Sequence, residues 1–96
     1  MFKEISAQKV QEMQEEDAVN VVDIRDPGSF ARVHIHNAGS LSAGNVKEYI
    51  ENTDKEKPLV VCCYHGNSSR GAAEYLSQNG FKEVYSMTGG FDAWPD

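Results

Sequence analysis

The sequence has no apolar run long enough to cross a membrane. Its longest, residues 59–64, has six residues, whereas a membrane-spanning helix needs about 20. The first four residues carry one lysine and are followed by no apolar core, so they do not resemble a secretory signal peptide. We therefore expect a cytoplasmic protein with no membrane partner.

Positive charge is also scarce. The 96 residues include 9 Lys and Arg against 15 Asp and Glu, which gives a formal net charge of −6. Proteins that bind nucleic acid usually present a basic face to the phosphates, so we expect no nucleic-acid partner. If the substrate is an anion, a local feature must overcome the negative field of the whole protein.

Cysteine is limited to two adjacent residues, Cys62 and Cys63. Neighbouring side chains on a strand point to opposite faces, so the pair cannot form an ordinary disulfide or one side of a zinc site. A disulfide-stapled secreted scaffold is therefore not expected. We expect at least one of the two thiols to do chemistry.

The chain predicts one α/β domain covering residues 1–96, because no repeat, low-complexity tract or Pro/Gly linker interrupts it. Strands alternate with helix-length segments, which favours a parallel sheet with helices on both faces. Ser6 and Asp26 are predicted to cap helices, the second with Pro27 at its first position. The expected strands are 2–5, 19–24, 38–41, 59–62 and 84–87. One helix is expected to follow Ser6 and end near 16, and a second is expected to start at 27. Three more are expected over 44–52, 69–78 and 90–94.

The segment after the central strand 59–62 predicts an anion site. Cys63 is followed by small, polar, turn-competent residues and then by a helix. Such a loop can direct successive backbone N–H groups at one point, and the helix N-terminus adds further donors. Gly66 allows a positive φ in the turn. These features favour the thiolate of Cys63, which is the nucleophilic form, while Cys62 is expected to face the core.

Three stretches of the sequence resemble the rhodanese family, and most of all its GlpE-type single-domain thiosulfate sulfurtransferases. They are residues 22–27 with Phe30 and 34–35, the segment 60–73 that contains the loop, and residues 84–91 with 93–94. The resemblance implies a five-stranded parallel sheet and Cys63 as the catalytic residue. It implies transfer of a sulfane sulfur from thiosulfate or a similar small anion, through a Cys63 persulfide, to cyanide or a thiol acceptor, with no metal or organic cofactor.

The positions of the residues around Cys63 suggest their roles. Arg70 either adds positive potential at the rim or is a plain surface arginine. Asp23 and Arg25 follow a strand at the same sheet edge, and a structural ion pair is the favoured interpretation. Ser68 or Ser69 is also expected to cap the following helix. The residues expected to shape the substrate-binding cup are Tyr64, His65, Gly66, Asn67, Ser68 and Ser69.

Two alternative functions stay open. A cysteine phosphatase or arsenate reductase on the same fold needs an arginine six residues after the cysteine, but Ser69 occupies that position and Arg70 comes one residue later. The second alternative is a sulfur-relay module that delivers sulfur to a protein acceptor.

Overall fold

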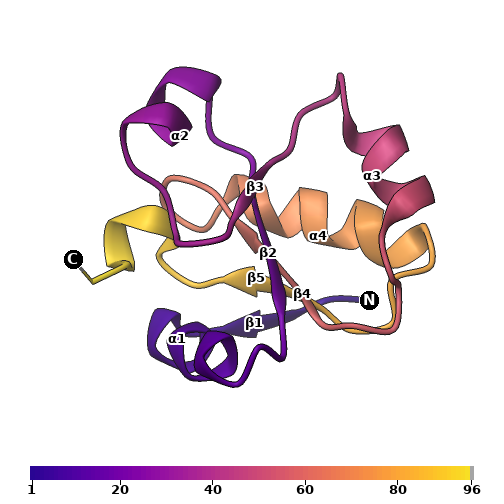
Figure 1. Ribbon diagram of the computed structural model, residues 1–96, viewed down its shortest axis with the longest axis horizontal. Coiled ribbons are helices and arrows are strands. Elements are labelled where there is room, and N and C mark those ends of the chain that lie inside the picture. Colours follow the sequence, from indigo (N-terminus) through magenta and orange to yellow (C-terminus); the bar gives the residue numbers. More distant parts are fainter. Residues whose placement is uncertain (96) are drawn as a thin grey trace.

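Five parallel strands form the centre of the protein in a computed structural model that describes residues 1–95 (Figure 1). The sheet has five parallel strands, as expected, in the order β1-β5-β4-β2-β3. In chain order the elements are β1 (Lys3–Ile5), α1 (Ala7–Glu15), β2 (Asn20–Asp23), α2 (Pro27–Arg32), β3 (Gly39–Ser40), α3 (Val46–Asn52), β4 (Leu59–Cys62), α4 (Ser68–Gln78), β5 (Val84–Met87) and the 3₁₀ helix η1 (Gly90–Ala93).

Strand β4 is central, as the sequence predicts. All four of its residues are buried, and it pairs in parallel with β2 on one side and β5 on the other. Val61, for example, lies opposite Val22 and Ser86. Because the strands are parallel, their carboxyl ends meet at one edge, and the chain leaves β4 there at Cys63.

The two faces of the sheet bury separate apolar clusters, so helices do cover both faces (Figure 1). On one face Val60 and Cys62 of β4 pack with Val10 of α1. On the other face Leu59 and Val61 pack with residues of α3 and α4. This alternation along β4 is the period of two expected of a strand buried on both faces.

Local capping signals begin the first two helices where the sequence predicts. The Ser6 side chain accepts a hydrogen bond of 3.1 Å from the Lys9 amide, and Asp26 accepts one of 2.9 Å from the Ser29 amide. Pro27 follows Asp26 at the start of α2, where a missing N–H costs nothing.

Most expected bounds agree within one residue, but helix α3 begins at Val46 and not at 44, and three further elements differ in detail. Strand β3 is only Gly39–Ser40, and the last helix is the 3₁₀ turn Gly90–Ala93. Helix α4 begins at Ser68, with Asn67 at its N-cap position and no side-chain cap. The expectation that Ser68 or Ser69 caps α4 is wrong, because both lie inside the helix and the Ser69 hydroxyl bonds to Ser86 instead.

No helix within residues 1–95 combines the length and the apolar character needed to cross a membrane.

Candidate active site

The sulfur of Cys63 lies in a cup of hydrogen-bond donors formed by residues 63–69, which we call the amide cup. The backbone amide of Gly66 lies 3.1 Å from Cys63 Sγ, and that of Ser69, in the first turn of α4, lies 3.3 Å from it. The Ser69 side chain and the His65 backbone also act to lower the pKa of this thiol. Cys63 is only 2% exposed, so a substrate meets the thiol at the floor of the cup.

The cup favours the thiolate of Cys63. Burial acts to raise the pKa of this thiol, but the hydrogen bonds from Ser69, Gly66 and His65 together outweigh it, so the pKa of Cys63 is lowered. A thiolate can only accept hydrogen bonds, and donors already aimed at it need no reorganisation. The arrangement therefore holds a nucleophilic sulfur ready in an otherwise acidic protein.

Two glycines allow the loop to close over the turn that follows β5. Gly66 has φ 93°, and a Cβ there would lie 2.8 Å from the Gly89 amide nitrogen. Gly90 has φ 61°, and a Cβ there would lie 2.5 Å from the Tyr64 carbonyl carbon and 2.6 Å from the Cys63 oxygen. The positive φ of Gly66 is as predicted. The close approach of the loop to Gly90 was not predicted from the sequence, although two consecutive glycines after a strand do indicate a tight turn there.

The turn after β5 also holds the loop by backbone hydrogen bonds. The amide of Phe91 donates to the Cys63 carbonyl at 2.7 Å, and that of Asp92 donates to the Tyr64 carbonyl at 3.2 Å. The Asp92 carboxylate lies 2.6 Å from Nδ1 of His65, and both side chains are exposed. The His65 ring thus pairs with Asp92 at the rim of the cup.

Cys62 faces away from the amide cup, as predicted. Its side chain is fully buried in the cluster on the α1 side of the sheet. Burial, with a smaller contribution from the nearby Asp23 carboxylate, raises the pKa of Cys62 to about 12. Two adjacent thiols therefore differ in character: one favours the anion, and the other stays protonated at neutral pH.

The predicted ion pair between Asp23 and Arg25 forms beneath the site. Arg25 Nη2 lies 2.8 Å from Asp23 Oδ2, and both side chains are nearly inaccessible. The same nitrogen donates to the Val33 carbonyl at 2.7 Å, and the guanidinium carbon lies 4.0 Å from the centre of the Phe91 ring. The pair therefore ties the end of β2 to η1, and through Phe91 to the Cys63 carbonyl.

The other predicted cup residues make no hydrogen bond to the sulfur among residues 1–95. The Tyr64 hydroxyl lies 3.3 Å from Ser29 Oγ and 3.4 Å from the Asp26 amide, so it joins the loop to the start of α2. Asn67 Oδ1 accepts a hydrogen bond of 3.0 Å from Arg70 Nη2. Ser68 is exposed. Of the six residues expected to form the cup, Gly66 and Ser69 donate hydrogen bonds to the sulfur.

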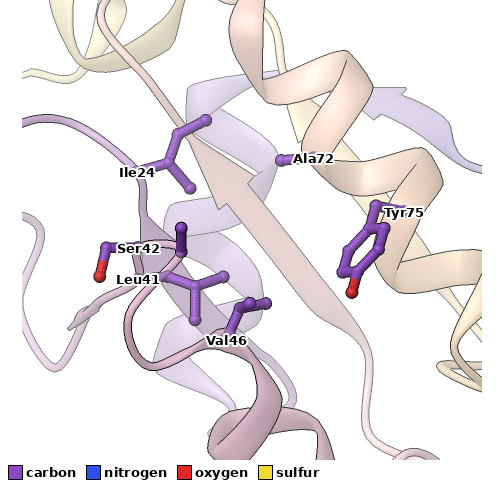
Figure 2. Close-up of a pocket in the computed structure, with 7 residues that line it drawn as sticks. Ile24, Leu41, Ser42, Val46, Ala72 and Tyr75 are labelled. Atoms are coloured by element: carbon purple, nitrogen blue, oxygen red, sulfur yellow. The ribbon is translucent and has the colours of Figure 1, made fainter.

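A separate apolar hollow of about 280 Å³ lies between α3 and α4. Figure 2 shows Val46 of α3 facing Ala72 and Tyr75 of α4 across it. None of the residues that donate to Cys63 lines this hollow. The remaining lining residues are Ile24, Leu41, Ser42 and Ala43.

The fold and the amide cup define an α/β protein that presents a cysteine thiolate at the carboxyl edge of a parallel sheet. A model of the rhodanese-like domain matches residues 6–96. The chain belongs to the rhodanese-like family, which confirms the resemblance seen in its motifs.

Individual relatives agree with this family. The chain is 52% identical to a thiosulfate sulfurtransferase GlpE of Ectopseudomonas mendocina, over 97% of this chain and 84% of that protein. The crystal structure of a rhodanese-related protein from Thermoplasma volcanium matches with a TM-score of 0.82 and 30% identity, over 97% of this chain and 90% of the other. A protein of unknown function from Rhodopseudomonas palustris, described as a possible tyrosine phosphatase, has a TM-score of 0.82 and 28% identity, over 97% of this chain and 79% of its own.

Proposed function

We propose that Cys63 is the sulfur-carrying nucleophile of this thiosulfate sulfurtransferase. The observation that carries the proposal is the pair of backbone amides that donate to its sulfur, those of Gly66 at 3.1 Å and Ser69 at 3.3 Å. The 52% identity to a thiosulfate sulfurtransferase supports the choice of substrate.

In the first half-reaction the Cys63 thiolate attacks the outer sulfur of thiosulfate. A bond forms between Sγ and that sulfur, the sulfur–sulfur bond of thiosulfate breaks, and sulfite leaves with the electron pair. The product is a Cys63 persulfide whose negative charge resides on the outer sulfur. This is covalent catalysis by an activated nucleophile, and the preorganised amides hold the charge throughout.

In the second half-reaction an acceptor removes the outer sulfur. Cyanide attacks it to give thiocyanate, or a thiol attacks it to give a new persulfide, whose proton comes from that thiol. In both cases the Sγ–S bond breaks and its electron pair returns to Cys63 as the thiolate. The donors that lower the pKa of Cys63 also stabilise it as the leaving group. A cysteine of a protein partner would react as the small thiol does, so a relay role would use the same amide cup. We propose that the reaction takes place in the cytoplasm.

The geometry disfavours the phosphatase alternative. A cysteine phosphatase places an arginine where this chain has Ser69, and the Ser69 side chain is fully buried against Ser86. Arg70, the next residue, donates to Asn67 on the surface. Position 69 therefore carries no guanidinium to clasp the oxygens of a tetrahedral oxyanion.

The experiment offers the same preparation thiosulfate with cyanide and, in parallel, p-nitrophenyl phosphate, with Cys63→Ser as the control. We expect thiocyanate from the native protein, none from the variant, and no hydrolysis of the phosphate ester. Intact mass after thiosulfate alone should increase by one sulfur atom. Cys63-dependent ester hydrolysis without thiocyanate would establish the phosphatase instead. Persulfide formation with very slow turnover of small acceptors would favour the protein relay.

A further inference from the structure

The apolar hollow between α3 and α4 begins beside Cys63 at the carboxyl edge of the sheet. Cys63, Ile24 and Leu41 are each the first residue after a strand, and their strands β4, β2 and β3 are neighbours in that order. The residues that precede them are paired across the sheet. Neighbouring strands lie about 4.8 Å apart. Ile24, which lines the hollow, is therefore next to Cys63, and Leu41 is one strand further away.

Cys63 and the wall of the hollow also lie on the same face of the sheet. Side chains two residues apart on a strand share a face, and Cys63 comes two residues after Val61. Val61 packs in the cluster on the α3 and α4 side, together with Ile24 and Leu41. The amide of Ile24 donates to the Cys62 carbonyl at 2.9 Å, so the pairing of β2 with β4 continues up to the cup.

Helix α4 links the cup to the opposite wall of the hollow. The Ser69 amide donates to Cys63 Sγ at 3.3 Å, and Ala72, one helical turn later, lines the hollow. Figure 2 shows Ile24 and Ala72 on either side of it. The hollow is therefore continuous with the surroundings of the reactive sulfur along both β2 and α4.

The chemistry of the lining indicates which substrate fits. The hollow has a volume of about 280 Å³, and no charged residue is among those that line it. Its polar side chains are the hydroxyls of Ser42 and Tyr75, and Tyr75 is 49% exposed, so the hollow is open to solvent. Thiosulfate is a dianion and finds no cation there, and cyanide has no carbon chain to bury. An apolar hollow of this kind favours an uncharged aliphatic group.

We propose that the hollow binds the carbon chain of an aliphatic thiol that accepts sulfur from Cys63. The proposal rests on the function proposed above and names the class of acceptor. With its chain in the hollow, the thiol sulfur bonds to the outer sulfur of the persulfide. The Sγ–S bond breaks, its electron pair returns to Cys63 as the thiolate, and the product is an alkyl persulfide that keeps the proton of the thiol. The cup thus takes the anionic donor, and the hollow selects the acceptor.

The test follows only the second half-reaction. Protein loaded with thiosulfate and freed of excess donor is mixed with mercaptoethanol, mercaptobutanol or mercaptohexanol, and loss of the added sulfur is measured by intact mass. We expect the second-order rate to rise roughly threefold for each methylene that the hollow buries, and at least about tenfold across the series. Hexanol, which has the chain but no thiol, should slow transfer to mercaptohexanol more than transfer to mercaptoethanol.

Variants of α4 separate the hollow from intrinsic differences between the thiols. Ala72→Leu fills the hollow and should remove most of the preference for mercaptohexanol over mercaptoethanol. Gly71→Leu is the matched control, because it adds the same side chain at a neighbouring position where a Cβ meets nothing within 4 Å, and it should keep the preference. If Ala72→Leu does not fold, Tyr75→Ser removes a half-exposed wall of the hollow and should also reduce the preference.

Equal rates for the three thiols, or a preference that survives in Ala72→Leu and in Tyr75→Ser, would overturn the proposal. A native dimer that Tyr75→Ser dissociates would assign the hollow to a second copy of the chain and overturn it as well. An NMR titration of the unloaded protein with hexanol needs no sulfur chemistry, and the methyl signals of Val46 and Ala72 should shift. If they shift but thiosulfate does not load Cys63, the proposed function fails. If loading succeeds and they do not shift, the assignment of the hollow fails.

Discussion

The backbone amide of Phe91 donates a hydrogen bond of 2.7 Å to the carbonyl oxygen of Cys63. This contact fixes the peptide unit that follows Cys63 to the turn after β5. The next amides in the loop are then free to direct their hydrogens at Sγ. The amide cup therefore depends on the turn after β5 as well as on the first turn of α4.

Gly90→Ala should disrupt the cup, because the new Cβ would lie 2.5 Å from the Tyr64 carbonyl carbon, a backbone atom that cannot rotate away. The positive φ of this residue adds strain. We expect a loss of about 2 kcal/mol in the free energy of unfolding, measured in urea, and at least a tenfold fall in thiocyanate formation, roughly 1.4 kcal/mol in the barrier.

The matched control for Gly90 is Gly71→Ala. Gly71 lies in α4, and a Cβ there meets nothing within 4 Å. Alanine is the better helix former by about 1 kcal/mol, so this variant should be at least as stable as the native protein and equally active. Native transfer rates in Gly90→Ala would show that the close approach does not shape the cup.

The two cysteines should respond differently to removal of their thiols. Cys63→Ser should abolish sulfur transfer, because a hydroxyl at this position remains protonated at neutral pH. Cys62→Ala should retain most of the transfer rate and lower the free energy of unfolding by about 1–2 kcal/mol, since it leaves a small cavity in the core. The thiosulfate–cyanide assay and urea unfolding measure the two effects. Equal loss of activity in both variants would contradict the assignment of a single working thiol.

Because the pKa of Cys63 is lowered, its thiol should be alkylated at a lower pH than the thiol of a free cysteine. Because the folded protein favours the thiolate, the rate of alkylation by iodoacetamide should reach half its maximum below the ~8.5 of a free cysteine. The measurement is made in Cys62→Ala so that a single thiol reports. A midpoint at or above the free value would mean that burial outweighs the donors of the cup.

Breaking the buried ion pair should be costly. Asp23→Asn removes the partner charge of Arg25, whose side chain is 5% exposed, and leaves a buried cation without its carboxylate. We expect the free energy of unfolding to fall by about 3–5 kcal/mol, measured by urea unfolding. The exposed pair Lys9–Glu12, 3.7 Å apart, is the control, and Glu12→Gln should change little because solvent screens it. Similar effects of the two substitutions would argue against a structural role for the buried pair.

The sequence alone determined the features that depend on nearby residues. Ser6 and Asp26 cap their helices because a cap needs only a side chain and an amide three residues on. The opposite orientations of Cys62 and Cys63 follow from the alternation of a strand. The thiol-bearing loop before α4 was predictable because its donors, Gly66 and Ser69, lie within six residues of the sulfur they bond.

Tertiary structure decided what joins distant segments. Ser68 and Ser69 were good candidates for a helix cap, but the Ser69 hydroxyl bonds to Ser86, 17 residues away and on another strand. Gly90 supports the cup only because parallel pairing of β4 with β5 brings their carboxyl ends together. A local pattern sets the preferences of a few successive residues, whereas these contacts depend on strand order, register and close packing, which exist only once the sheet has formed.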